Sequence, residues 1–258
     1  MTQTPQVSRI EKWRQTQEAI GSASEKLFDL HAGKEIEVFG SACALIHNCF
    51  AAAEKCGTPK QRTAMVALAQ AYQQLLSSWE DLRRGRLTAS MAHWRSLWES
   101  PEYISACAID NEFAHTWGDL SRRRTVKPEK ARRVMCRWMN DREAGLGDKW
   151  RLKRIEQESQ LRSFSHVSAP AALQATLGAV GGRFIVAEAA YAPRLRFAAL
   201  YIALRAKDIL VAAGFAFADL LDGEWNSEFD MLVVGAEATL DAESTNLLKR
   251  LEETQVPA

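Results

Sequence analysis

Two residues with clear chemical potential, Arg162 and His166, lie at the end of a helix predicted at 150–166. They are four residues apart, so on a helix their side chains lie one turn apart on the same face. An imidazole can transfer protons near neutral pH, and a guanidinium can hold a phosphate through two hydrogen bonds. Together the pair suits cleavage of RNA by attack of its own 2′-hydroxyl, and the nearby Ser159 would contact the substrate. Alternatively, His166 interacts with the helix dipole and Arg162 is solvated.

A basic segment precedes and overlaps this helix. Between Arg122 and Arg154, thirteen basic residues stand against four acidic ones, a local charge of +9 in a chain of net charge +1. Such a segment can attract RNA phosphates or another anionic partner. Within it we expect Arg133 and Arg137 to contact the substrate. The alternative is a solvated face that acidic neighbours balance in the fold.

Two tryptophans within the basic segment offer a second mode of contact. Trp138 and Trp150 could each stack on a nucleobase, because an aromatic ring offers a flat apolar face. The chain contains eight tryptophans, and most of them are candidates for the hydrophobic core. Core packing is therefore the alternative for these two residues as well.

Arg95 and Glu99 form another candidate pair at helical spacing. They are four residues apart and flanked by Trp94, Leu97 and Trp98, so we expect them to be partly buried. They can pair along the helix surface or reach across to another helix or to a substrate. A buried arginine with a carboxylate more often fixes how helices pack than performs chemistry, so a structural role is the leading interpretation.

Several classes of protein are not expected from the sequence. The five cysteines are odd in number and lack Cys-x-x-Cys spacing, which favours free, mostly buried thiols in a reducing cytoplasm. No metal-type histidine spacing, glycine-rich phosphate loop or dinucleotide fingerprint occurs, so neither a metal nor a cofactor is expected. The apolar runs at 198–204 and 209–221 are separated by charged residues, and the N-terminus has no signal-peptide pattern, so no membrane association is expected.

The apolar periodicity predicts an all-α helical bundle. Three cap-and-proline signals resemble the start of a helix: Thr58-Pro59, Ser100-Pro101, and Thr125 with Pro128 three residues later. Helix ends or breaks are expected at Gly57, Gly85, Gly145 and Gly147. Gly181-Gly182 before an apolar run predicts at most one small β-hairpin near 177–187. The expected helices cover residues 7–30, 35–56, 59–84, 87–99, 101–120, 128–143, 150–166, 193–221 and 242–252.

The expected organisation is one domain with terminal additions. N-terminal helices at 1–57 would pack on a central helical domain at 58–222. The helix after Pro193 is apolar on most sides, which predicts a central position in that domain. An acidic tail at 223–258 would carry a short helix at 242–252, capped by Asp241.

The order of two motifs resembles a known group of proteins. GRLTASMAHWRSLWES at 85–100 is followed by LRSFSHVS at 161–168, then by a glycine-marked excursion and a long apolar helix. This arrangement, over roughly residues 60–222, is similar to uncharacterised bacterial helical proteins that are HEPN-like. The resemblance implies an antiparallel, often dimeric bundle in which Arg162 and His166 stand where the nuclease branch has its Arg and His. Here fewer residues separate the two than in that branch, so a non-cleaving member is the alternative.

These observations predict an HEPN-like protein that binds or cleaves RNA, in stress response or phage defence. His166 would transfer the proton, Arg162 would hold the phosphate, and the segment 122–154 would supply affinity. The enzyme, if active, would be a metal-independent ribonuclease. The alternative function is a non-catalytic module that forms a homodimer or binds a protein partner, with the basic segment on an acidic protein surface.

Overall fold

The computed structural model describes residues 9–119, 121–122, 126–165 and 192–253, and this part of the chain is all-α. The prediction of an all-α helical bundle is therefore confirmed, and the hairpin predicted at 177–187 lies outside the described residues. The helices are α1 (Arg9–His31), α2 (Gly33–Cys49), η1 (Phe50–Lys55), α3 (Pro59–Arg83), α4 (Leu87–Ala92), α5 (Trp94–Ile109), α6 (Asn111–Gly118), α7 (Pro128–Asn140), α8 (Leu146–Ser165), α10 (Ala192–Phe217), η3 (Ala218–Leu220) and α11 (Gly223–Glu253).

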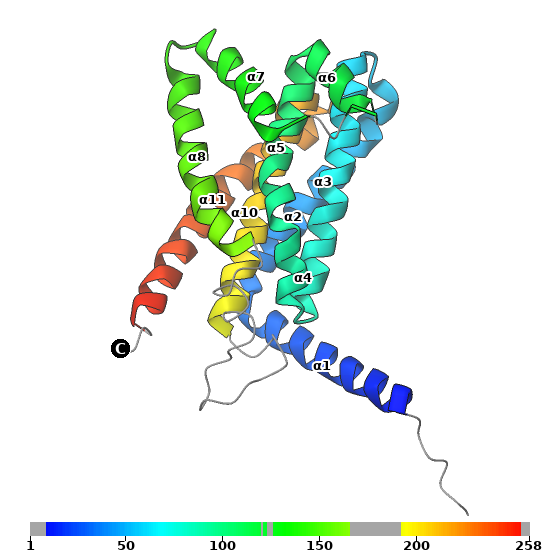
Figure 1. Ribbon diagram of the computed structural model, residues 1–258, viewed down its shortest axis with the longest axis vertical. Helices are drawn as coiled ribbons and strands as arrows, with labels where there is room; N and C mark the ends of the chain where they lie inside the picture. The colour runs from blue at the N-terminus through cyan, green and yellow to red at the C-terminus, as the bar shows by residue number, and fades with distance from the viewer. Residues whose placement is uncertain (1–8, 120, 123–125, 166–191, 254–258) are drawn as a thin grey trace, which may run out of the picture.

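Helices α3, α5 and α10 pack on one another and run along the long axis of the bundle (Figure 1). The chain runs down α3, turns through α4 and returns along α5, so α3 and α5 are antiparallel. Helix α2 packs on α10 from the other side, and α11 packs on both α10 and α2. Helices α7 and α8 form a hairpin whose turn lies at one end of the bundle: α7 packs on α5 there, and α8 runs back alongside the bundle toward α4. The start of α1 extends away from the opposite end.

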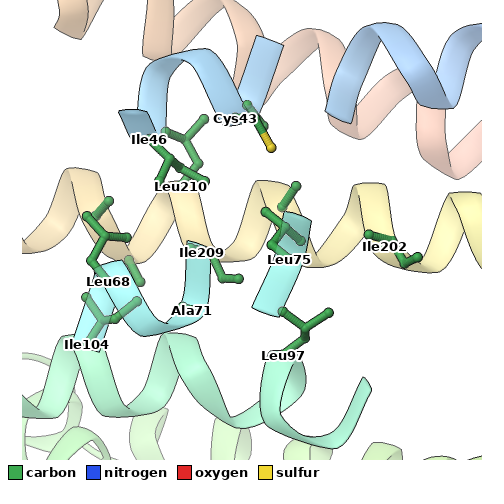
Figure 2. Packing of buried hydrophobic residues seen from close by; sticks show 14 of the residues in the cluster. Cys43, Ile46, Leu68, Ala71, Leu75, Leu97, Ile104, Ile202, Ile209 and Leu210 are labelled. Atoms are coloured by element: carbon green, nitrogen blue, oxygen red, sulfur yellow. The ribbon is translucent and has the colours of Figure 1, made fainter. Parts of the chain in front are cut away.

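Helix α10 lies at the centre of the hydrophobic core, as its apolar sequence predicts. Figure 2 shows Ile202, Ile209 and Leu210 of α10 between α2 on one side and α3 with α5 on the other. All three side chains are fully buried. A helix that is apolar on most sides must be covered on most sides, and α10 meets that requirement by packing on α2, α3, α5 and α11.

The predicted signals at the ends of α3 are confirmed. The Thr58 hydroxyl accepts a hydrogen bond from the backbone N–H of Gln61 (3.2 Å), and the Gln61 side chain accepts one from the backbone N–H of Thr58 (3.1 Å). This reciprocal arrangement satisfies two amides that a helix start leaves unpaired. Beyond the other end of α3, Gly85 has a φ of 74°. A residue without a Cβ adopts such a φ at little cost.

The helix start predicted at Ser100-Pro101 is wrong. Helix α5 continues through both residues from Trp94 to Ile109. The Ser100 hydroxyl donates back to the carbonyl of Ser96 (2.7 Å), so it does not cap a new helix. The break comes instead at Asp110, whose carboxylate accepts from the backbone N–H of Phe113 (2.8 Å) and starts α6.

The short helix predicted at 242–252 is also wrong, because α11 already begins at Gly223. Asp222, not Asp241, starts it by accepting a hydrogen bond from the backbone N–H of Trp225 (2.8 Å). Trp225 is buried and donates its indole N–H to the carbonyl of Leu45 in α2 (3.0 Å). This contact joins the first turn of α11 to the core.

One described stretch, Gly33–Lys55, is long and apolar enough to cross a membrane by length and composition alone. In the structure, 44% of its most apolar window is buried inside the protein. The core helix of a soluble protein passes the same test. This stretch includes α2, which packs on α10 in the bundle.

Four of the five cysteines are buried, and none of the five forms a disulfide. This confirms the prediction of free, mostly buried thiols. Burial raises the pKa of Cys43 and of Cys49 to about 12. These two thiols are therefore protonated and unreactive at neutral pH, because the thiolate is the nucleophile.

Candidate functional site

The α7–α8 hairpin carries most of the described basic segment, and its geometry is set by a tight turn. Gly145 has a φ of 78°, and the backbone N–H of Gly147 donates to the side-chain carbonyl of Asn140 (2.8 Å). The Asn140 amide donates in turn to Asp148 (3.1 Å). A Cβ at Gly147 would overlap the backbone carbonyl of Cys136, so the first turn of α8 passes directly against α7.

Replacing Gly147 with alanine is expected to lower the free energy of unfolding by about 1–3 kcal/mol, because the new methyl group would push α7 and α8 apart. Urea unfolding followed by circular dichroism measures the change. Gly40→Ala in α2 is the matched control, because open space surrounds that position. Replacing a helical glycine that has such space with alanine should raise the free energy of unfolding by about 0.5–1 kcal/mol. Equal losses in the two variants would contradict the close approach at Gly147.

Arg133 and Arg137 lie one turn apart on the exposed face of α7. Together with Arg151 and Asp148 of α8 they line a surface groove of about 430 Å³. Glu129 partly neutralises this groove, since its carboxylate lies 3.0 Å from Arg151 Nε and 3.9 Å from Arg133 Nε. Arg137 makes no ion pair with any described residue. Asp141 lines the same groove, so the groove carries both charges, and Arg137 is the guanidinium that stands exposed in it without an ion pair to a described residue.

Arg132 and Arg154 of the basic segment do not belong to this exposed face. Both guanidinium groups turn inward to Glu102 of α5: Arg132 Nε lies 3.0 Å from Glu102 Oε2 and Arg154 Nε lies 2.8 Å from Oε1. Glu102 and Arg132 are almost fully buried. These two residues of the segment therefore do not face solvent, because a buried carboxylate must be paired.

Burial and pairing act in opposite directions on this cluster. Burial raises the pKa of Glu102, and the charges of Arg154 and Arg132 oppose that rise. Burial also lowers the pKa of Arg154, and the carboxylate of Glu102 opposes that change. A guanidinium remains charged at neutral pH in either case. The cluster therefore joins α5, α7 and α8 through charge-assisted hydrogen bonds.

Helix α10 joins the same cluster through Arg205. The guanidinium of Arg154 lies 3.6 Å from the ring centroid of Trp98, and that of Arg205 lies 4.6 Å from the same centroid. Arg205 also pairs with Asp208, with 2.8 Å between Nη1 and Oδ2. Three inward arginines thus pair with two carboxylates, and two of these arginines lie over the same indole ring.

The predicted pair Arg95 and Glu99 lies along the surface of α5. Arg95 Nε is 3.0 Å from Glu99 Oε1, and the Arg95 side chain is 54% exposed. Glu99 is the more buried partner and lines a small polar pocket with Tyr103 and Trp117. Of the arrangements considered, the structure shows pairing along the helix; the expected partial burial holds for Glu99 but is wrong for Arg95, and the pair does not line the groove of Arg133 and Arg137.

The predicted catalytic residues fall at the edge of the described chain. Helix α8 extends to Ser165, so the backbone of Ser159 and Arg162 is helical as predicted. Their side chains and all of His166 lie outside the described residues. The pairing of Arg162 with His166 therefore remains a prediction.

Glu102 is the central residue that sequence reasoning missed. The sequence carried a signal: Trp98, Glu102, Ser105 and Ile109 recur at spacings of four, three and four, so Glu102 shares one helix face with two large apolar residues. A carboxylate in such a position needs a cation from another element. Which of the many arginines would supply it could not be predicted from spacing.

Comparison with known proteins gives the chain no family. No protein-family model, curated protein or solved structure matches it. The resemblance to HEPN-like proteins thus rests on the motifs at 85–100 and 161–168 alone. Within the described residues, no group of three or more histidine, cysteine, aspartate or glutamate side chains could hold a metal ion.

Proposed function

We propose that this protein is an HEPN-like RNA-binding protein of the cytoplasm, acting in stress response or phage defence. One observation carries the proposal: Arg133 and Arg137 flank an exposed groove in which Arg137 has no described ion-pair partner. Guanidinium groups one turn apart suit successive phosphates of an RNA strand. The buried free thiols support a reducing compartment.

Cleavage of the bound RNA is the second part of the proposal. The imidazole of His166 would take the proton from a ribose 2′-hydroxyl, whose oxygen then attacks the adjacent phosphorus. Arg162 would hold the non-bridging phosphate oxygens while the 5′-oxygen leaves and takes up a proton. The products would be a 2′,3′-cyclic phosphate and a 5′-hydroxyl end. This reaction requires no metal ion.

The test is incubation of the protein with total and structured RNA in a metal chelator, followed by mapping of fragment ends. The parent should cleave, and His166→Ala should not. His115→Ala is the matched control, since His115 is exposed on α6 and should be dispensable. Binding of RNA by the parent without cleavage would overturn the ribonuclease and leave the RNA-binding proposal. Absence of both would overturn the whole proposal.

The alternative function is a helical oligomerisation or protein-interaction module. It is supported by the outward face of α8, where Leu152 is 67% exposed and Ile155 is 41% exposed. Exposed apolar side chains close together mark protein contacts more often than scattered ones do. Sedimentation of the parent and of Leu152→Asp separates the two outcomes: only an interface at α8 predicts a dimer that the variant dissociates.

A further inference from the structure

A second hollow lies on the inner side of the α7–α8 hairpin. It is a cavity of about 320 Å³ between α5, α7, α8 and α10. Its walls include Trp138, Trp150 and Phe215, and its polar lining includes Glu102, Arg154 and Asp208. Small-molecule sites combine these features: a volume of about 300–1,000 Å³, mostly apolar walls and a few polar groups.

The aromatic walls differ in how much surface they leave uncovered. Trp138 already has two partners: Phe215 in a T-shaped contact with ring centroids 4.9 Å apart, and the guanidinium of Arg142 at 3.5 Å from the ring centroid. Trp150 is half-buried and makes no aromatic or cation–π contact with any described residue. Its indole is therefore the ring that a flat ligand could cover.

The polar lining offers one donor and one acceptor. Arg154 uses Nε on Glu102 and Nη2 on the carbonyl of Trp98 (2.7 Å), so Nη1 makes no hydrogen bond to a described residue. Asp208 uses Oδ2 on Arg205, and its Oδ1 likewise makes none within the described chain. Glu102 is fully engaged by two arginines. A ligand would therefore meet Arg154 and Asp208.

We propose that this cavity binds a nucleobase, stacked on Trp150, with a base carbonyl or ring nitrogen accepting from Arg154 and a base N–H donating to Asp208. An aliphatic ligand would cover the two polar groups without pairing them, which is costly. A metal ion would require carboxylates that are not already committed to arginines. Nucleobases are flat and carry donors and acceptors on one edge, so they fit both the wall and the lining.

The base could belong to a free nucleotide or to a single-stranded RNA held in the surface groove of Arg133 and Arg137, which we call the outer groove. Only the second source rests on the proposed function. If the base belongs to an RNA strand, the cavity would bind one base of that strand while the groove binds its phosphates. Two arms of one experiment distinguish the sources. Calorimetry with AMP, GMP, CMP and UMP tests the free nucleotide. A short single-stranded RNA and an abasic ribose-phosphate chain of equal length test the base within a strand.

At least one of these ligands should bind with a dependence on the base. Trp150→Ala should weaken that binding about tenfold or more, as expected for loss of a stacked base. Val211→Trp should have a similar effect by filling the cavity, since Val211 lines it and is 40% exposed, which leaves the core intact. Trp13→Ala is the control, because Trp13 is 63% exposed on α1, and it should bind as the parent does. Thermal unfolding confirms that each variant is folded.

The outcomes separate this inference from the proposed function. If no nucleotide saturates the protein at millimolar concentration and RNA binds no better than the abasic chain, the cavity does not bind bases. In that case, binding of both the RNA and the abasic chain would still support RNA binding through the groove of Arg133 and Arg137. If a nucleotide binds but neither chain does, RNA binding fails and the base site remains. Unchanged base binding in both Trp150→Ala and Val211→Trp would also overturn the assignment.

Discussion

Replacing Glu102 with alanine is expected to lower the free energy of unfolding by about 3–5 kcal/mol, the typical loss when one partner of a buried ion pair is removed. The variant would leave the guanidinium groups of Arg132 and Arg154 without their shared carboxylate, and Arg132 is almost fully buried. The loss should appear as a lower urea midpoint, because denaturant unfolding reports stability directly.

Glu99→Ala is the matched control for this prediction. Glu99 lies on the same helix and also pairs with an arginine, but its partner Arg95 is 54% exposed. An ion pair whose arginine is open to solvent contributes about 0–1 kcal/mol, so this variant should lose much less stability than Glu102→Ala even though the Glu99 side chain is 13% exposed. If Glu102→Ala were no more destabilising than Glu99→Ala, the cluster around Glu102 would not hold α5, α7 and α8 together.

Ile209→Ala is expected to cost about 2–5 kcal/mol of stability. Ile209 lies on α10 at the centre of the core, facing Ala71 and the α3–α5 layer in Figure 2, and its side chain is fully buried. Removing its branched chain would lose the transfer free energy of the deleted atoms and leave a cavity that helices packed on all sides cannot readily close.

The control for Ile209 is Val211→Ala, two positions along the same helix. Val211 is 40% exposed. Its truncation should therefore cost less than about 1 kcal/mol. Chemical unfolding of both variants under the same conditions measures the difference. Similar losses at the two positions would contradict the central place of α10.

The fold class and several helix ends could be predicted from the sequence because local chemistry determines them. Thr58 with Gln61, and Gly85 with its positive φ, act within a few residues, so their roles do not depend on distant packing. Ser100-Pro101 presents a similar local pattern, yet α5 runs through it. Packing of Trp98 and Glu102 on neighbouring helices outweighs the local preference there.

The candidate site was predicted only in part. Arg133 and Arg137 are exposed, as a phosphate-binding role needs, but their neighbour Arg132 points inward to a glutamate thirty residues earlier in the sequence. Residue type does not show which of these arginines is buried, because the packing of α5 and α8 determines the buried face of α7. Trp138 and Trp150 were predicted as alternatives for base stacking or core, and the fold brings both to one cavity.

The most direct test of RNA binding through the outer groove is a salt titration with single-stranded RNA. The parent is compared with Arg133→Ala/Arg137→Ala, and with a control, Arg83→Ala/Arg84→Ala, at the opposite end of the bundle (Figure 1). For two lost phosphate contacts, the double variant should bind more weakly and its log–log salt slope should fall by about 1.4, whereas the control should match the parent. Equal affinity and slope in all three proteins would contradict RNA binding through this groove.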